Sequence, residues 1–156
     1  MINLPEGVIK FFNTQRFSIV STIDKDGSPH NACKGMVDIE KGGRVYLLDL
    51  YKGKTLENLT RDPSISLTAV DEHKFAGYSL KGKAKIVDKD KIEPHIIKLW
   101  ERKITGRISH RLLKNIKEEK GHAAHPEALL PKPEYLIEVD VEEIIDLMPN
   151  HIRKTR

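Results

Sequence analysis

The sequence predicts a mainly β protein with flanking helices, built on an antiparallel six-stranded sheet that curls into a barrel. Short segments in which apolar and polar residues alternate recur along the chain, as in half-buried strands. The turns between most of them are short and rich in Gly, Asp and Lys. Connections this short join antiparallel neighbours, because a parallel crossover needs a dozen or more residues. Helical spacing of apolar residues is confined to a few stretches.

Length and composition indicate one folded domain, residues 1–156. The 156 residues are 38% hydrophobic and 32% charged, which is typical of a globular chain. No apolar run approaches the ~20 residues of a membrane span, and the first residues do not resemble a secretory signal. Cys33, the single cysteine, cannot form an intrachain disulfide. We therefore expect a cytoplasmic protein with no membrane partner.

The N-terminal third predicts a short helix followed by a meander of strands. Residues 5–12 begin with Pro and carry apolar side chains at helical spacing. Residues 17–23 alternate, and Asp24–Gly27 forms a turn into a partner strand at 29–39. A Gly-containing turn then leads to a third strand, 44–50.

The middle of the second strand has an unusual composition. Cys33, Lys34 and Gly35 stand where a strand built only for packing would carry bulky apolar residues. A glycine inside a strand weakens it unless something must approach the backbone closely. A bulge at a barrel corner and a nearby ligand both account for this composition.

A basic turn follows the third strand. Lys52, Lys54, the Thr55 hydroxyl and the free backbone N–H groups of a helix start converge there, which predicts an anion site suited to a terminal phosphate. Gly53 allows close approach or a positive φ. A solvated turn is the alternative interpretation. The turn is not a Walker loop, because the required upstream glycine is missing.

The rest of the chain predicts three strands and three helices. Thr55 is expected to cap a short helix that Pro63 ends, and Gly106 is expected to separate two helices of an insertion at about 89–121. The strands are 65–69, 75–87 and 135–148, and the insertion helices are 88–103 and 108–121.

The insertion carries most of the positive charge. Pro94–Lys120 contains eight Lys or Arg and three Glu, within a chain of formal net charge +4. A nucleic-acid surface would interleave aromatic residues with this charge, and only Trp100 is present. A solvated helical face or a docking surface is favoured. A metal site from His110, His122 and His125 is not expected, because no Cys or Asp accompanies them.

The order of these segments resembles the pyridoxamine 5'-phosphate oxidase-like family of FMN-binding split barrels. The resemblance covers residues 17–87 and the last strand. It is carried by T-I-D-K-D-G-S-P-H, R-V-Y-L-L, G-K-T-L-E-N-L-T-R-D-P-S-I-S-L, G-Y-S-L-K-G-K-A-K-I-V and Y-L-I-E-V.

The resemblance implies a homodimer with FMN at the subunit interface. The loop matching Gly53–Thr55 would bind the phosphate with help from Lys52, and two strand segments would flank the ribityl chain and the ring. Gly77 and Tyr78 would reach in from the second subunit, and Trp100 would cover the ring or pack its helix. The implied cofactor-binding residues are Ala32, Cys33, Lys34, Leu47, Leu48, Asp49, Lys52, Gly53, Lys54, Thr55, Gly77, Tyr78 and Trp100.

Three functions are weighed. The leading one is an FMN-dependent oxidoreductase that exchanges electrons with a small molecule or a redox protein, with Lys34 near the pyrimidine end of the flavin. Oxidation of the vitamin itself is not expected, because the family's S-R-K loop and C-terminal arginines are not matched. The second is a non-catalytic binding module for haem, deazaflavin or flavin sensing, in which His73, His110 or His122 could ligate haem. The third is a nucleic-acid binder.

Overall fold

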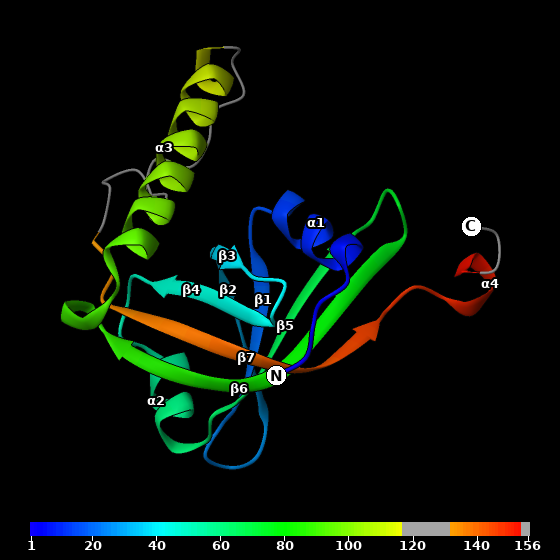
Figure 1. Cartoon of the computed structure of the whole chain (residues 1–156), viewed down its shortest axis with the longest axis horizontal. Coiled ribbons are helices and arrows are strands. Elements are labelled where there is room, and N and C mark those ends of the chain that lie inside the picture. The colour runs from blue at the N-terminus through cyan, green and yellow to red at the C-terminus, as the bar shows by residue number, and fades with distance from the viewer. Residues whose placement is uncertain (117–131, 154–156) are drawn as a thin grey trace.

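The computed structural model describes residues 1–116 and 132–153. Seven strands of this part form one antiparallel sheet in the order β2-β1-β5-β6-β7-β4-β3 (Figure 1). The strands are β1 Ser18–Ile23, β2 Pro29–Lys34, β3 Met36–Ile39, β4 Arg44–Asp49, β5 Ser64–Asp71, β6 Ala76–Asp88 and β7 Tyr135–Asp146. The helices are α1 Glu6–Thr14, α2 Lys54–Arg61, the 3-10 turn η1 Lys89–Lys91, α3 Pro94–Ile116 and α4 Asn150–Arg153.

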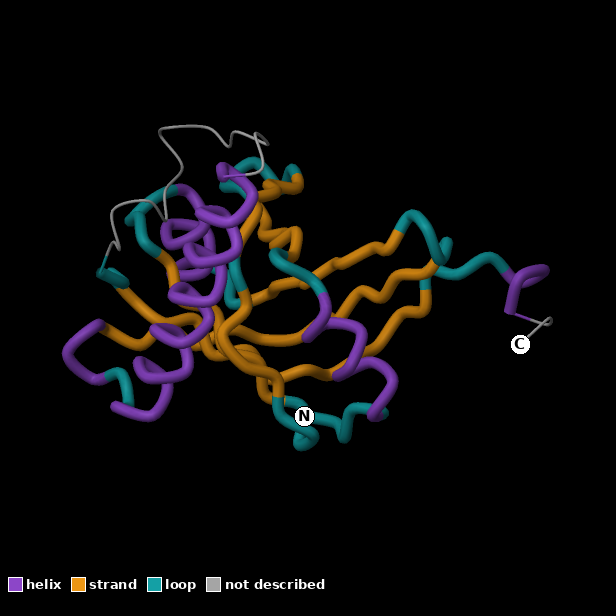
Figure 2. The backbone as a smooth tube through the Cα atoms, turned by 90° about the horizontal axis from the view of Figure 1, so that it is seen from above, coloured by secondary structure: helices purple, strands orange, loops and turns teal. Residues whose placement is uncertain are grey.

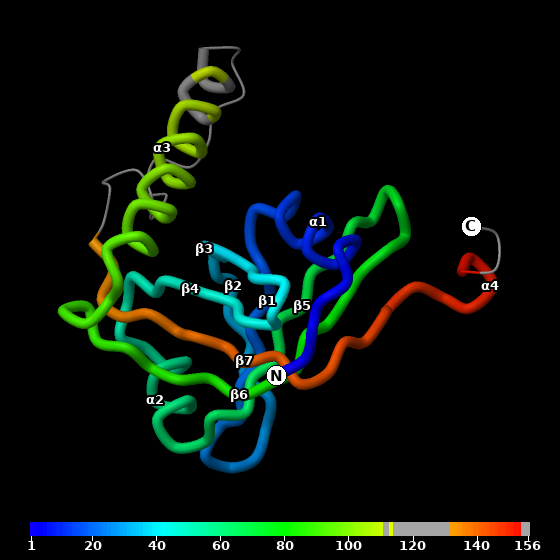
Figure 3. The backbone as a smooth tube through the Cα atoms, viewed as in Figure 1, coloured from blue at the N-terminus to red at the C-terminus, as the bar shows by residue number. Residues whose placement is uncertain are grey.

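The sheet curls into a barrel because of one connection. β2 and β3 are joined by Gly35 alone, yet they lie at opposite edges of the sheet. The two edges must therefore meet, and the sheet wraps into a split barrel (Figure 3). The predicted single strand 29–39 is wrong for this reason: the chain leaves one edge at Lys34 and joins the other at Met36. The sheet consequently has seven strands where six were expected.

The barrel interior is the main core. It is formed by the inward-facing residues of the strands together with apolar residues from the N-terminal segment and α1, including Leu4, Val8 and Phe12. The predicted alternation in β6 is confirmed, because Leu80 is buried while Lys81 and Lys83 face solvent. The central pairing joins Arg44–Asp49 of β4 to Tyr135–Asp140 of β7 in antiparallel register.

The two ends of the barrel are covered by different helices. α1 and α3 lie on the same side of the molecule, as the view from above shows (Figure 2). α2 lies at the other end, where Asn58 Nδ2 donates to Thr22 Oγ1 at 3.0 Å and to Asp24 Oδ1 at 2.7 Å. The short helix that was predicted to end before Pro63 is confirmed.

A second apolar cluster anchors α3 on the outer face of the sheet. Val37, Tyr46, Leu48 and Leu136 pack there against Ile92 and Ile96. α3 then runs unbroken through Gly106 to Ile116, so the predicted break at Gly106 is wrong. One glycine costs a helix about 1 kcal/mol, which the continuing turns on both sides outweigh. The last part of the predicted second helix, 117–121, lies outside the described residues. No helix of the described part is long and apolar enough to span a membrane.

Gly82 is predicted to be essential for the packing of β6 against β7. A Cβ at Gly82 would lie 2.1 Å from the Asp140 carbonyl oxygen, at the point where the β6–β7 register shifts. We expect Gly82→Ala to lower the free energy of unfolding by about 2 kcal/mol, because backbone must move to admit the methyl group. Urea unfolding followed by circular dichroism measures this.

Gly7→Ala is the matched control. Gly7 lies in α1, and a Cβ there meets nothing within 4 Å. We expect it to leave stability unchanged or raise it by up to about 1 kcal/mol, because alanine favours helix. Equal losses for both variants would contradict the proposed packing at Gly82.

Candidate functional site

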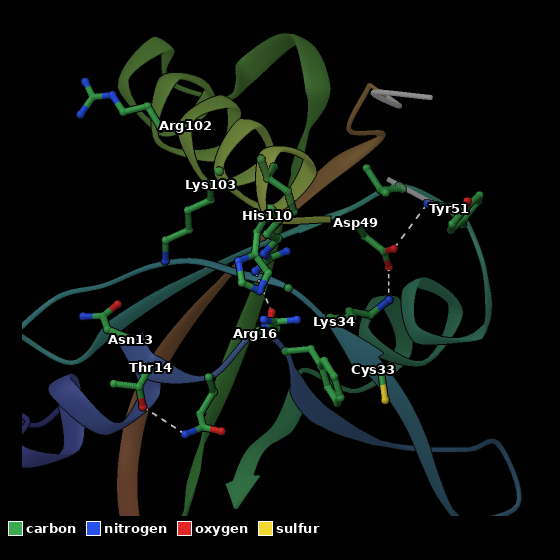
Figure 4. A pocket seen from close by; sticks show the side chains of 17 residues that line it. Asn13, Thr14, Arg16, Cys33, Lys34, Asp49, Tyr51, Arg102, Lys103 and His110 are labelled. Atoms are coloured by element: carbon green, nitrogen blue, oxygen red, sulfur yellow. Dashed lines mark hydrogen bonds and ion pairs between the residues drawn. The ribbon is translucent and has the colours of Figure 1, made fainter. Parts of the chain in front are cut away.

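The candidate site is a pocket of about 700 Å³ where α3 overhangs the closing edges of the barrel (Figure 4). Its walls come from three places: the end of α1 with the α1–β1 loop, the ends of β2 and β4 with the residues that follow them, and the middle of α3. The lining residues are 13–17, 33–35, 48–51, 102, 103, 106, 107 and 110. The volume lies within the range of small-molecule sites.

A buried ion pair holds the barrel side of the pocket. The Lys34 ammonium at the end of β2 binds the Asp49 carboxylate at the end of β4, and their side chains are 10% and 8% exposed. Tyr135 donates its hydroxyl to the same carboxylate oxygen, and the Tyr51 backbone N–H approaches the other at 3.4 Å. Burial, followed by the bond to Asp49, raises the pKa of the Tyr135 phenol, which therefore stays a donor. This network joins three strands at the split.

Four of the predicted site residues line the pocket: Cys33, Lys34, Leu48 and Asp49. Cys33 is exposed, so its side chain does not belong to the core. The Lys34 charge is compensated by Asp49, so a ligand would meet the pair and not an isolated cation. Leu47 is fully buried inside the barrel, and its side chain is not available to a ligand.

The basic turn lies beside the pocket, next to Tyr51. Gly53 is the N-cap of α2, with φ −126°, so the predicted cap at Thr55 is wrong. Thr55 is buried in the first helical turn, and the helix begins two residues earlier than expected. Gly53 does not use a positive φ, and a Cβ there would meet nothing within 4 Å. No side chain caps this helix start.

The two lysines of the turn are both exposed and loosely paired. Lys54 Nζ lies 3.2 Å from Glu57 Oε2, and Lys52 Nζ lies 3.9 Å from Glu134 Oε2. Exposed pairs of this kind contribute little to stability. Both ammonium groups can therefore turn toward an anion at the helix start.

Three predicted residues lie elsewhere in the chain. Tyr78 packs edge-on against Phe11, with ring centroids 5.2 Å apart. A Cβ at neighbouring Gly77 would lie 2.9 Å from the Ala69 carbonyl oxygen, so this glycine serves strand packing. Trp100 packs against the outer apolar cluster. Within one chain, these three residues do not line the pocket.

The structure adds cationic residues that sequence reasoning did not assign to the site. Lys103 Nζ donates to the Met36 carbonyl at 3.3 Å, and Arg107 Nη2 donates to the Arg16 carbonyl at 2.7 Å. His110 follows on the same face of α3 and also lines the pocket. Their spacing of four and three residues was a signal that they share one helical face. The sequence did not indicate which wall of the barrel that face would meet.

The histidines do not form a metal centre in the described part of the chain, where no group of three possible ligands occurs. His110 lines the pocket, whereas His73 is exposed in the β5–β6 turn beside Glu72. His122 and His125, which were weighed as metal ligands, lie outside the described residues.

The fold and the pocket define a class of protein: a split barrel with a pocket at its closing edges. The pyridoxamine 5'-phosphate oxidase family model matches residues 4–147, nearly the whole chain. The chain therefore belongs to the pyridoxamine 5'-phosphate oxidase family. Among curated proteins, no sequence match is found.

Solved structures support the same fold. HupZ of Group A Streptococcus aligns with a TM-score of 0.62 and 19% identity, over 93% of this chain and 94% of HupZ. A Clostridium acetobutylicum protein related to general stress protein 26, of the pyridoxinephosphate oxidase family, aligns with a TM-score of 0.56 and 16% identity. The alignment covers 96% of this chain and 99% of that protein. An F420 reductase aligns with a TM-score of 0.57 and 16% identity, over 91% of this chain and 98% of the reductase. At these identities the likeness shows the fold alone.

The Lys34–Asp49 pair is predicted to stabilise the closed barrel. Asp49→Asn leaves a buried ammonium without its counter-charge, so we expect the free energy of unfolding to fall by about 3 kcal/mol. The matched control is Asp140→Asn, which breaks the pair with Arg44 in the same sheet. That pair is far more exposed, and we expect a loss below about 1 kcal/mol. Denaturant unfolding compares the two variants. Equal losses of stability would show that the Lys34–Asp49 pair has no special role.

Proposed function

We propose that the protein binds FMN and acts as an oxidoreductase that passes electrons between the flavin and a small molecule or a redox protein. The observation that supports this proposal most is that the pocket and the basic turn before α2 are adjacent. The pocket borders the strand ends that carry flavin in this family, and the basic start of α2 follows directly after its wall residue Tyr51. A molecule with a planar ring at one end and a phosphate at the other fits this arrangement.

The start of α2 fits a phosphate group. It has no side-chain cap. The Leu56 and Glu57 N–H groups donate to the Gly53 carbonyl, which leaves the Lys54 and Thr55 N–H groups at the helix start available to a ligand. Lys52 and Lys54 are exposed beside it, and the space around Gly53 is open. Two kinds of donor, the two ammonium groups and the backbone amides, suit a doubly negative ester better than a carboxylate.

The pocket walls fit a flavin ring. Leu48 supplies apolar surface, and the backbone of β2 and β4 beside Cys33 and Asp49 supplies donors and acceptors. Bound FMN would supply hydride and single-electron chemistry. The chain's own contribution is to orient the ring, to exclude water beneath α3, and to hold the Lys34–Asp49 pair at its edge.

We propose a homodimer whose second copy completes this site. Phe17, Ile19 and Ile23 expose apolar side chains on the outer face of β1. Ile19 pairs in register with Cys33, and both Cys33 and Phe17 line the pocket, so this apolar strip is continuous with the site. A second copy seated there would bury the strip and close the pocket. The exposed free thiol of Cys33 suits a reducing compartment, and we propose the cytoplasm.

A deazaflavin is the second candidate cofactor, because one of the structural neighbours is an F420 reductase. Haem is the third, because His110 lines the pocket and a haem iron needs an axial ligand. The visible spectrum of the purified protein distinguishes them, since flavin, deazaflavin and haem absorb at different wavelengths. A colourless protein that gains no absorbance on titration with FMN would end the flavin proposal.

Lys54→Ala is expected to weaken FMN binding at least about tenfold, because a charge-assisted bond to the phosphate is lost. Riboflavin lacks the phosphate, and we expect its affinity to change less than about twofold. Glu57→Gln is the matched control: it removes the carboxylate that competes for Lys54, so FMN should bind more tightly and riboflavin should not. Fluorescence titration measures the affinity of each variant for FMN and for riboflavin. Equal weakening of both flavins by Lys54→Ala would show that the phosphate lies elsewhere.

Ile19→Asp is expected to convert the dimer into monomers and to weaken FMN binding, because it puts a charge on the proposed interface. Phe75→Asp is the control, since Phe75 is 61% exposed but lies in the β5–β6 turn. Sedimentation at micromolar concentration gives the mass of each variant. A parent protein that sediments as a monomer would contradict the proposed interface.

A further inference from the structure

Lys103 is held between α3 and the first residue of β3. The next residue of α3, Ile104, is buried, so this turn of the helix packs against the body of the protein. Lys103 Nζ donates to the Met36 carbonyl at 3.3 Å. The β3–β4 register shifts between Met36 and Asp38, so this carbonyl lies at an irregular point of the ladder. The Lys103 side chain is half-buried, and Figure 4 shows it descending from the helix.

No carboxylate of the described residues contacts the Lys103 ammonium group. Its direct polar partner there is the Met36 carbonyl, and Asp38 attracts it without forming an ion pair. Lys34, which also lines the pocket, differs because Asp49 binds it. A carboxylate in contact would favour the charged form of a lysine, whereas a backbone carbonyl accepts a hydrogen bond from a neutral amine as well. The contacts of Lys103 therefore permit the neutral amine.

The surroundings of Lys103 disfavour its charged form. Burial lowers the pKa of its ammonium group, the attraction of Asp38 acts in the opposite direction, and Arg107 lowers the pKa further. An ordinary lysine, with a pKa of about 10.4, is neutral in only about one molecule in 2,500 at pH 7. A lowered pKa raises that fraction, and only the neutral amine is a nucleophile. The other titratable groups on the pocket walls formed by α3 and the α1–β1 loop are basic: Arg16, Arg102 and His110.

The pocket gives a small molecule access to this amine. Lys103 lines the space of about 700 Å³, and the end of α1 contributes the uncharged Asn13 and Thr14 to the same lining. A neutral carbonyl compound can therefore enter without displacing a bound charge. The proposed flavin ring lies against the strand ends beside Cys33 and Asp49, whereas Lys103 belongs to the wall formed by α3.

We propose that Lys103 is a nucleophilic lysine that binds a small aldehyde covalently as an imine. The neutral amine nitrogen attacks the carbonyl carbon, and a C–N bond forms. The aldehyde oxygen leaves as water with the two protons that the amine gives up, and a C=N double bond remains. The step needs no oxidant or reductant, and hydrolysis reverses it. This activity goes beyond the proposed flavin function and does not depend on FMN.

Reductive trapping with benzaldehyde tests the proposal. Cyanoborohydride reduces an imine to a stable benzylamine, and peptide mass spectrometry of the purified full chain locates it. Lys98 is the internal reference, because it is an exposed lysine of the same helix. We expect Lys103 to be labelled at least about tenfold faster than Lys98 at pH 7. Labelling of Lys103 should also saturate as the benzaldehyde concentration rises, because the aldehyde first binds in the pocket, whereas labelling of Lys98 should rise linearly.

Asp38→Asn is expected to speed the labelling of Lys103 at pH 7 at least about threefold, because it removes the attraction that favours the ammonium form. Asp140→Asn is the matched control. It removes a carboxylate from the same sheet that pairs with Arg44 and does not act on Lys103, so the labelling rate should stay the same.

The outcomes separate this proposal from the cofactor proposal. Labelling of Lys103 that is no faster than that of Lys98, or that does not saturate, would overturn the imine site. Equal labelling rates in Asp38→Asn and the parent protein would overturn it as well. If Asp38→Asn does not fold, the comparison of the two lysines in the parent protein decides the result. FMN is titrated separately. A protein that traps benzaldehyde at Lys103 but binds no FMN would overturn the proposed function and support the imine site.

Discussion

The structure depends on closing a seven-stranded sheet with a single-residue connection. Gly35 joins β2 to β3, which lie at opposite edges, so the two edges must be held together at this point. Hydrogen-bonded pairing does not do this, because β2 pairs with β1 and β3 with β4. The Lys34–Asp49 pair, with Tyr135 bonded to the same carboxylate, bridges the gap instead. Burial makes this pair costly to break and fixes the geometry of the pocket wall.

The meeting of the two sheet edges also explains why the pocket lies where it does. A split barrel exposes backbone and polar side chains at its closing edges, whereas its interior is filled by apolar residues such as Leu47, Leu67 and Ile137. α3 covers the seam, and a Cβ on Gly35 would lie 2.8 Å from the Arg107 guanidinium. The helix, the ion pair and the basic turn before α2 therefore surround one space.

Much of the fold could be predicted from the sequence, because alternation and turn chemistry are local signals. Asp24–Gly27 and the alternating run from Tyr78 both appear where expected. The strand break at Gly35 could not be predicted, since it depends on which edge of the sheet the chain joins next. The continuity of α3 through Gly106 could not be predicted either, because a single glycine weakens a helix without deciding whether it ends. For the site, Cys33, Lys34, Leu48 and Asp49 were identified through family resemblance. Arg16, Lys103 and Arg107 were not, because no local pattern shows which surface a helix will cover.

The central claim is that a phosphate ester binds at the start of α2 while the attached ring occupies the pocket. Backbone hydrogen exchange, measured by mass spectrometry with and without FMN, tests it most directly. The account predicts that FMN slows exchange in 53–56 at the helix start and at the strand ends 32–34 and 47–49. Riboflavin should protect the strand ends but not the helix start. Protection absent from both regions, or identical with the two flavins, would contradict the account.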